Sequence, residues 1–168
     1  MGLVAHFKMM ADYHRWAHEI LLRHIKPISN DEYRHECGLY FQSVHGTLNH
    51  LLLGDMLWHG RFVGRPVAIT GLDHEFHSSR EALMAALTSQ AACWVDYVAQ
   101  LTEARCKEVL SYQSSKGIQY ALPTGQLLGH VFNHGTHHRG QVSAIITQLG
   151  YPCPEMDLVY YMLDRDKG

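Results

Sequence analysis

The sequence of 168 residues lacks a long hydrophobic run and an excess of either charge. Its longest strongly apolar stretch, Leu51-Leu52-Leu53, is interrupted at once by Gly54-Asp55, so we expect no segment that spans a membrane. The formal net charge is -2, and neither sign is gathered into a long run. This balance argues against a nucleic-acid-binding surface and against a polybasic membrane anchor. We therefore expect neither nucleic acid nor a membrane as a partner.

Paired cysteines are also missing. The four cysteines, at positions 37, 93, 106 and 153, include no CxxC pair. Scattered cysteines are typical of reduced thiols in the cytoplasm, and no signal peptide is visible at the start of the chain. We therefore expect a cytoplasmic protein. Its length fits a single domain, residues 1–168, with a sizeable core.

Apolar residues recur at three- and four-residue spacing in four long segments, and this spacing predicts four helices. Ser78 and Glu81 form a capping box for the third helix, and Thr124 can cap the fourth. Between the first two helices, Ser29-Asn30-Asp31 is a turn signal in a polar, irregular segment. The predicted helices span residues 3–25, 41–63, 78–106 and 124–149.

The periodicity changes in residues 107–123, where two short apolar segments flank Ser114-Ser115-Lys116-Gly117. This pattern predicts a short β-hairpin. The tail, 151–168, ends in an apolar segment over 158–163 that we expect to pack back onto the domain or to contact a partner. The sequence therefore predicts an all-α fold, a four-helix bundle with a short β-hairpin before the last helix.

Histidine is unusually frequent, with 14 residues, and four histidines lie within nine positions of the fourth predicted helix. His134 and His138 lie one turn apart on one helix face, and two such imidazoles can bind one metal ion if further ligands come from elsewhere. His130 continues the same stripe and could replace either of them. His137 points away and could form a hydrogen bond at a neighbouring helix or interface. In so histidine-rich a chain, such a pair can also arise by chance.

His50 on the second predicted helix offers a third nitrogen ligand. It shares a helix face with Gly46 and Gly54, whose bare backbone leaves room for a metal and a ligand or for close helix contact. A bundle brings inward faces together, so His50, His134 and His138 could form one site. Three protein ligands with open positions are typical of a reactive metal site rather than a structural one.

Imidazole ligands suit zinc, nickel, copper or iron(II), and a metal-bound water or thiol loses its proton near neutral pH. Further candidates surround these ligands. We expect His14 to be a hydrogen-bonded core histidine. The alternative is that it supports the metal ligands without binding the metal itself. Gln141 could orient a bound water or ligand, or could be an ordinary solvated or interhelical amide. We expect Arg139 to be a surface or interface cation.

Two stretches closely resemble the DinB (damage-inducible) superfamily, the YfiT-like metal-binding bundles. They are Phe41–Leu52 followed by Trp58, and Asn133–Gln141. Tyr13–Ala17 and Asp157-Leu158 are also similar to this family, so the resemblance covers essentially the whole chain.

The resemblance implies a bundle of up-down-down-up connectivity that forms a homodimer. It also implies a divalent metal on His50, His134 and His138, with His130 and His137 outside the ligand set. Relatives tend to have asparagine in the first helix where this chain has His14 and His18. This difference would allow an extra nitrogen near the metal.

Characterised relatives include thiol-dependent S-transferases and a mycothiol-dependent isomerase. The resemblance therefore implies one divalent metal ion (zinc, nickel or iron) that activates a low-molecular-weight thiol or water against a small-molecule electrophile, as in a transferase or hydrolase. The alternative is a non-catalytic, stress-related dimeric bundle in which the metal only stabilises the fold.

Overall fold

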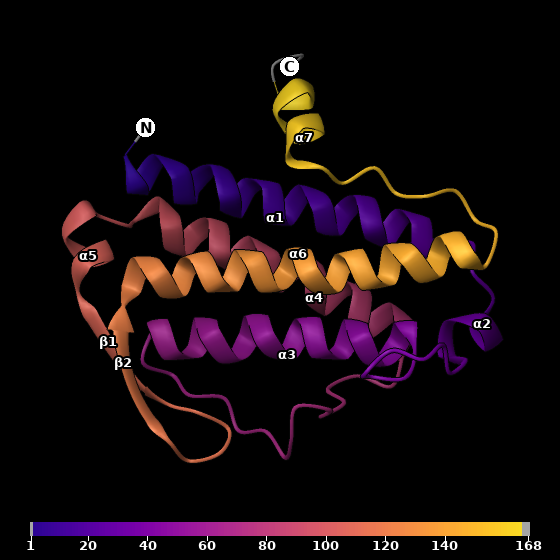
Figure 1. Ribbon diagram of the computed structural model, residues 1–168, viewed down its shortest axis with the longest axis horizontal. Coiled ribbons are helices and arrows are strands. Elements are labelled where there is room, and N and C mark those ends of the chain that lie inside the picture. The colour runs from indigo at the N-terminus through magenta and orange to yellow at the C-terminus, as the bar shows by residue number, and fades with distance from the viewer. Residues whose placement is uncertain (1, 166–168) are drawn as a thin grey trace.

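The computed structural model describes residues 2–165; Met1 and residues 166–168, the ends of the predicted domain and apolar tail, lie outside the described residues. Within it, α1 and α6 run in one direction and α3 and α4 in the opposite direction (Figure 1). The predicted four-helix bundle of up-down-down-up connectivity is confirmed. The long helices are α1 Leu3–Ile25, α3 Val44–Phe62, α4 Arg80–Ala99 and α6 Thr124–Gln148.

The core is divided along the bundle axis. α1 and α3 each pack against both α4 and α6. One apolar cluster includes Leu21, Leu48 and Val142, and a second includes Phe7 and Phe132. On α1, α3 and α6, the turns between these two clusters carry buried polar side chains. The candidate site is built on these middle turns of α6 and on the neighbouring turn of α3 that carries His50, with apolar packing on both sides of it.

Some bounds of the helix predictions are wrong. The second predicted helix, 41–63, begins only at Val44, because Ser43 caps it by accepting a hydrogen bond from the backbone of Gly46. The turn signal at Ser29 begins a short helix instead, α2 Asn30–Arg34, because Ser29 and Glu32 form a capping box. The third predicted helix, 78–106, spans Arg80–Ala99 instead, and its cap is Ser79 rather than Ser78, because Ser79 accepts the capping hydrogen bond from the backbone of Ala82. A separate short helix, α5 Glu103–Lys107, follows with Thr102 as its own cap.

The predicted hairpin is present and leads directly into α6. β1 Val109–Gln113 pairs with β2 Gln119–Pro123 in antiparallel register. Thr124, predicted as a cap, is instead the first residue of α6, and its hydroxyl donates 2.9 Å to the carbonyl of Glu108 at the base of the hairpin. The start of α6 is therefore fixed by the hairpin and not by a side-chain cap.

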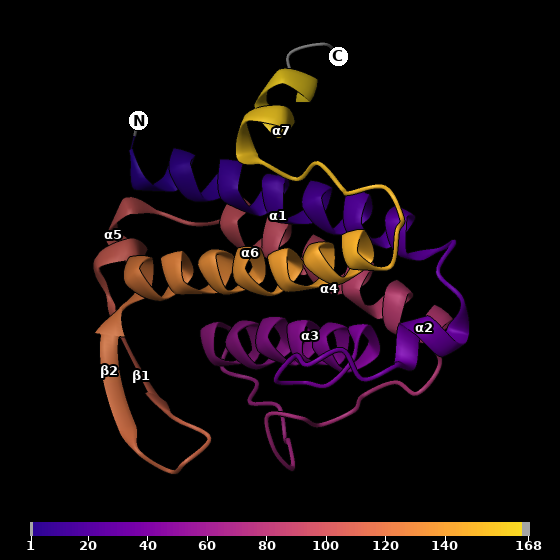
Figure 2. The same ribbon diagram turned by 45° about the vertical axis from the view of Figure 1, so that its right-hand side comes forward.

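The chain returns from α3 to α4 through a long connection, residues 63–79, that runs back along α3 (Figures 1 and 2). Asn49 of α3 fastens it, because its side-chain oxygen accepts hydrogen bonds from the backbone of Phe76 and His77. This attachment places the carbonyl of Leu72 beside His50. None of the helices in residues 2–165 is long and apolar enough to cross a membrane.

The C-terminal segment packs back onto the bundle, as predicted for the tail. α7 Leu158–Arg165 stands against the outer side of α1 (Figure 2). Its buried Tyr161 contacts the rings of Tyr13 and Trp16. This contact covers part of α1 on the side away from α3.

Candidate metal site

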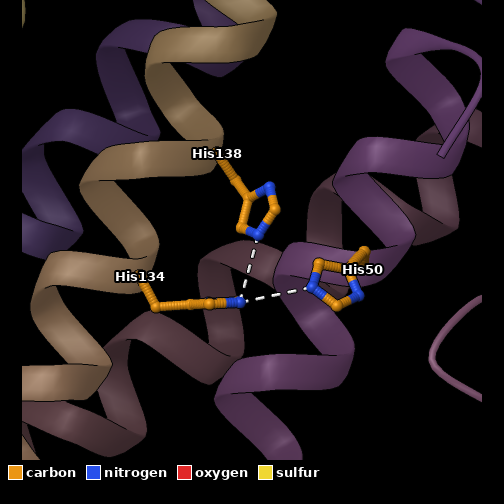
Figure 3. A group of neighbouring side chains, drawn as sticks. All are labelled: His50, His134 and His138. Atoms are coloured by element: carbon orange, nitrogen blue, oxygen red, sulfur yellow. Dashed lines mark hydrogen bonds between the residues drawn. The ribbon is translucent and has the colours of Figure 1, made fainter. Parts of the chain in front are cut away.

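Three histidine side chains from two helices point at one another in the middle of the bundle (Figure 3). His134 and His138 come from successive turns of α6, and His50 comes from α3. The Nε2 atom of His134 lies 3.2 Å from that of His50 and 3.1 Å from that of His138. One ligand atom from each residue lies within 4.8 Å of the other two, so the group could hold a metal ion.

The hydrogen bonds behind these rings decide which nitrogens carry protons. Nδ1 of His50 lies 2.8 Å from the carbonyl oxygen of Leu72, and Nδ1 of His138 lies 2.7 Å from Oε1 of Gln141. Both neighbours are acceptors, so each Nδ1 donates a proton and each Nε2 keeps a lone pair. Both lone pairs then face His134, whose Nε2 can carry one hydrogen at most. Nitrogen lone pairs that converge in this way are what a metal ion requires.

Burial keeps the three imidazoles neutral. It is the main cause that lowers the pKa of His134 to about 3, with further lowering by His138 and His50. Burial likewise lowers the pKa of His138 to about 4, against the opposing hydrogen bond to Gln141, and lowers that of His50. Neutral imidazole is the form that binds metals, so protons compete weakly for this site near neutral pH.

Phe41 forms one wall of the site. Its ring stacks on His50, with ring centroids 3.7 Å apart and 16° between the planes, and makes a T-shaped contact with the ring of His138 at a centroid distance of 5.8 Å. The next residue, Gln42, has a φ of 67°, a strained conformation for a residue other than glycine. Phe41 also lines a cavity of about 630 Å³. Sequence reasoning used Phe41 only as part of a motif and missed its place at the site.

The other sequence-predicted candidates on α6 fall outside the converging nitrogens. His130 is exposed and meets the ring of Trp58 at 5.2 Å. His137 is exposed beside His138. Gln141 binds His138 directly, a role that differs from both expectations for it, because Gln141 orients the imidazole itself.

His14 belongs to a second buried group behind the site. It is fully buried and hydrogen bonded, as expected for a core histidine, and its partners are Asp55 and Arg139. The expectation for Arg139 is wrong: it is 1% exposed and not a surface cation. Sequence reasoning also missed Asp55, which it took only as the residue that interrupts an apolar run. A charged residue at an otherwise apolar position of α3 was the available signal.

Comparisons with known proteins identify the same family over nearly the full chain. A family model described as the DinB family matches residues 4–166. Protein DinB of Bacillus subtilis (strain 168) is 27% identical over 160 residues, which cover 90% of this chain and 90% of that protein. The fold is similar to the crystal structure of a DinB-like protein from Bacillus cereus ATCC 10987. That likeness has a TM-score of 0.59 and 15% identity, and covers 83% of this chain and 89% of the other.

Proposed function

The chain belongs to the DinB family, and we propose that it is a metal-dependent enzyme that directs a thiol or water at a small electrophile. His50, His134 and His138 would hold one divalent ion. The observation that carries this proposal is the convergence of their Nε2 atoms, with Nδ1 of His50 and of His138 engaged elsewhere. Their donor set fits zinc, nickel or iron(II).

Three protein ligands leave coordination positions open, and a divalent ion bound there would lower the pKa of a coordinated water or thiol into the neutral range. The protein's own contribution is to keep the ligands neutral and oriented. Leu72 and Gln141 fix the ring orientations of His50 and His138 through their acceptor oxygens. In the thiol reaction, the sulfur would form a bond to the electrophilic carbon while the leaving group departs with its bonding electron pair.

The cavity beside Phe41 supports a small-molecule substrate. Its volume of about 630 Å³ lies within the range of small-molecule sites. Phe41, one of its lining residues, stacks on the imidazole of His50. Side chains of both charges line it, among them Arg34 and Glu75. Such a cavity would accept a polar molecule with its reacting group directed past Phe41. The homodimer implied by the family resemblance stays a prediction.

Metal binding is the first part of the proposal to test. Purified protein, stripped with a chelator and titrated with zinc, nickel or cobalt(II), should bind one ion per chain. His50→Ala and His134→Ala should abolish this binding, because two remaining imidazoles cannot hold the ion alone. His130→Ala removes an imidazole from the same stripe of α6 without touching the converging nitrogens, and should bind as the unaltered protein does. Equal binding by all four proteins would refute the site.

Thiol activation is the second part. Cobalt(II)-loaded protein should change its visible spectrum when cysteine or glutathione is added, and should speed the reaction of that thiol with chlorodinitrobenzene. The alternative, a metal that only stabilises the fold, predicts a raised melting temperature with no spectral change and no acceleration. That result would refute the enzyme proposal while leaving the metal site in place.

A further inference from the structure

A chain of three buried side chains lies behind His134. Nε2 of His14, on α1, lies 2.9 Å from Oδ2 of Asp55, on α3. Nη1 of Arg139, on α6, lies 3.0 Å from Nδ1 of His14. The exposed fractions of His14, Asp55 and Arg139 are 0%, 2% and 1%. Three helices of the bundle are therefore tied together by directional polar bonds inside the core.

Within this hydrogen-bonded group of three side chains, the negative charge of Asp55 balances the positive charge of Arg139. The guanidinium of Arg139 can only donate, so Nδ1 of His14 accepts and Nε2 of His14 donates to Asp55. Burial opposes ionisation of Asp55, but the pKa of its carboxyl group is lowered all the same, in part by the hydrogen bond from His14 and by the charge of Arg139. A buried carboxylate and a buried guanidinium thus face opposite ends of one neutral imidazole. Removal of either partner would leave an uncompensated charge in the core.

The chain interlocks with the three-histidine site through two glycines. A Cβ at Gly54 would lie 2.8 Å from Cε1 of His134, so His134 packs directly on the backbone of α3. A Cβ at Gly135 would lie 2.7 Å from Cε1 of His14, so His14 packs directly on the backbone of α6. Asp55 follows Gly54 in sequence, and Gly135 follows His134. On α3, Gly54 packs against His134 of the site, and the next residue, Asp55, belongs to the buried group. On α6, His134 belongs to the site, and the next residue, Gly135, packs against His14 of the buried group.

His14, His18 and Asp55 also place ligand atoms within 4.8 Å of one another, as a second metal site would. The hydrogen bonds argue against that assignment. A metal on Nε2 of His14 would move the ring proton to Nδ1, where it would face the N–H of Arg139 at 3.0 Å. A divalent ion would also add charge beside a guanidinium that already balances Asp55. The hydrogen-bonded chain is therefore the better account of this cluster.

We propose that Asp55, His14 and Arg139 are positioning residues for the three-histidine site. They hold α3 and α6 against α1 at the spacing and axial register at which His50 meets His134 and His138. This inference rests on the proposed metal binding. It concerns metal affinity and ligand geometry, and it assigns none of the three residues to the metal.

The test uses two conservative variants. Asp55→Asn keeps the shape of the side chain but removes its charge, and Arg139→Lys keeps the charge but removes the planar fork. Cobalt(II) affinity would be measured by competition with a chelator, and ligand geometry by the visible absorption spectrum. We expect each variant to lower the affinity at least about tenfold, the scale seen when residues behind metal ligands are changed. We also expect the spectrum to change.

Leu87→Ala is the matched control. Leu87 is fully buried on α4 in the apolar cluster and belongs to neither polar group. It should lower the melting temperature while leaving cobalt(II) affinity and spectrum unchanged in the folded protein. An equal loss of affinity in this control would show that general stability, and not positioning, sets the affinity, and would overturn the inference.

The remaining outcomes separate the inference from the proposed function. If the unaltered protein binds cobalt(II) and both variants match its affinity and spectrum, the positioning role is refuted while metal binding stands. If the unaltered protein binds no metal, the proposed function fails and the positioning role with it. Two ions per chain, one of them lost in Asp55→Asn, would assign a metal to the second cluster and refute the inference. Should Asp55→Asn not fold, Arg139→Lys decides.

Discussion

His18 makes the stability of the protein sensitive to acid. It is 1% exposed, and its Nδ1 donates 2.8 Å to the carbonyl of His14 one turn earlier on α1. Its Nε2 has no hydrogen-bond partner among the described residues. Burial is the main cause that lowers the pKa of His18 from 6.5 to about 3, and the neighbouring His14 and Arg139 lower it further.

The sign and size of the effect follow from proton binding. Between pH 6.5 and about 3, the unfolded chain binds a proton at His18 and the folded chain does not. Acid therefore favours the unfolded state, and the free energy of unfolding falls as the pH falls through this range. The full shift corresponds to about 5 kcal/mol, at ~1.36 kcal/mol per pKa unit. At about pH 4.5, two units below the ordinary value, the loss is about 3 kcal/mol.

Replacing His18 with leucine should remove this loss. Urea unfolding of the chelator-treated protein, followed by circular dichroism at about pH 7.5 and about pH 4.5, measures it. The stability of His18→Leu relative to the unaltered protein should rise by about 3 kcal/mol between these two conditions. His24→Leu is the matched control, because it removes the same kind of hydrogen bond, from Nδ1 of His24 to the carbonyl of Ile20, at a part-buried position of the same helix. A relative stability of His18→Leu that does not change with pH would refute the reasoning.

Two further substitutions test the packing and orientation of the candidate ligands. Gly54→Ala should displace His134, because the added Cβ would lie 2.8 Å from its Cε1, and should lower cobalt(II) affinity in a chelator competition. Gly129→Ala is the control for Gly54→Ala. Gly129 lies on the same helix as His134, and a Cβ added there would meet no atom within 4 Å. This variant should leave the affinity unchanged and raise the melting temperature, since alanine favours a helix by up to ~1 kcal/mol over glycine. Gln141→Leu should weaken metal binding about tenfold by releasing Nδ1 of His138, and a spectrum and affinity equal to those of the unaltered protein would count against that orienting role.

Local patterns predicted the elements well where one periodicity continues without competition. The first helix was predicted at residues 3–25 and spans Leu3–Ile25. The fourth was predicted at 124–149 and spans Thr124–Gln148. The third predicted helix was too long because its apolar periodicity continues to Cys106, which is buried, although the chain starts a new helix at the Thr102 cap. Periodicity reports burial, and a break between two helices that share a buried face does not interrupt it.

Arg139 shows the limit of local reasoning. A cation near the middle of a helix is normally solvated, and nothing in its own neighbourhood of sequence contradicts that expectation. Its burial depends on His14 and Asp55, which lie 125 and 84 positions earlier. Only the folded bundle brings these partners within hydrogen-bond distance of one another. The buried charge pair was therefore invisible until α1, α3 and α6 were placed in space.

By itself, the sequence determined the four amphipathic helices and placed His130, His134 and His138 on one stripe of the last one. A stripe repeats every turn, so it does not say which two of its histidines meet His50. That choice depends on the axial register of α3 relative to α6. The contact of His134 with Gly54 and the buried hydrogen bonds to His14 of α1 set this register. Those contacts join residues distant in sequence, so only the tertiary structure decided where the three imidazoles converge.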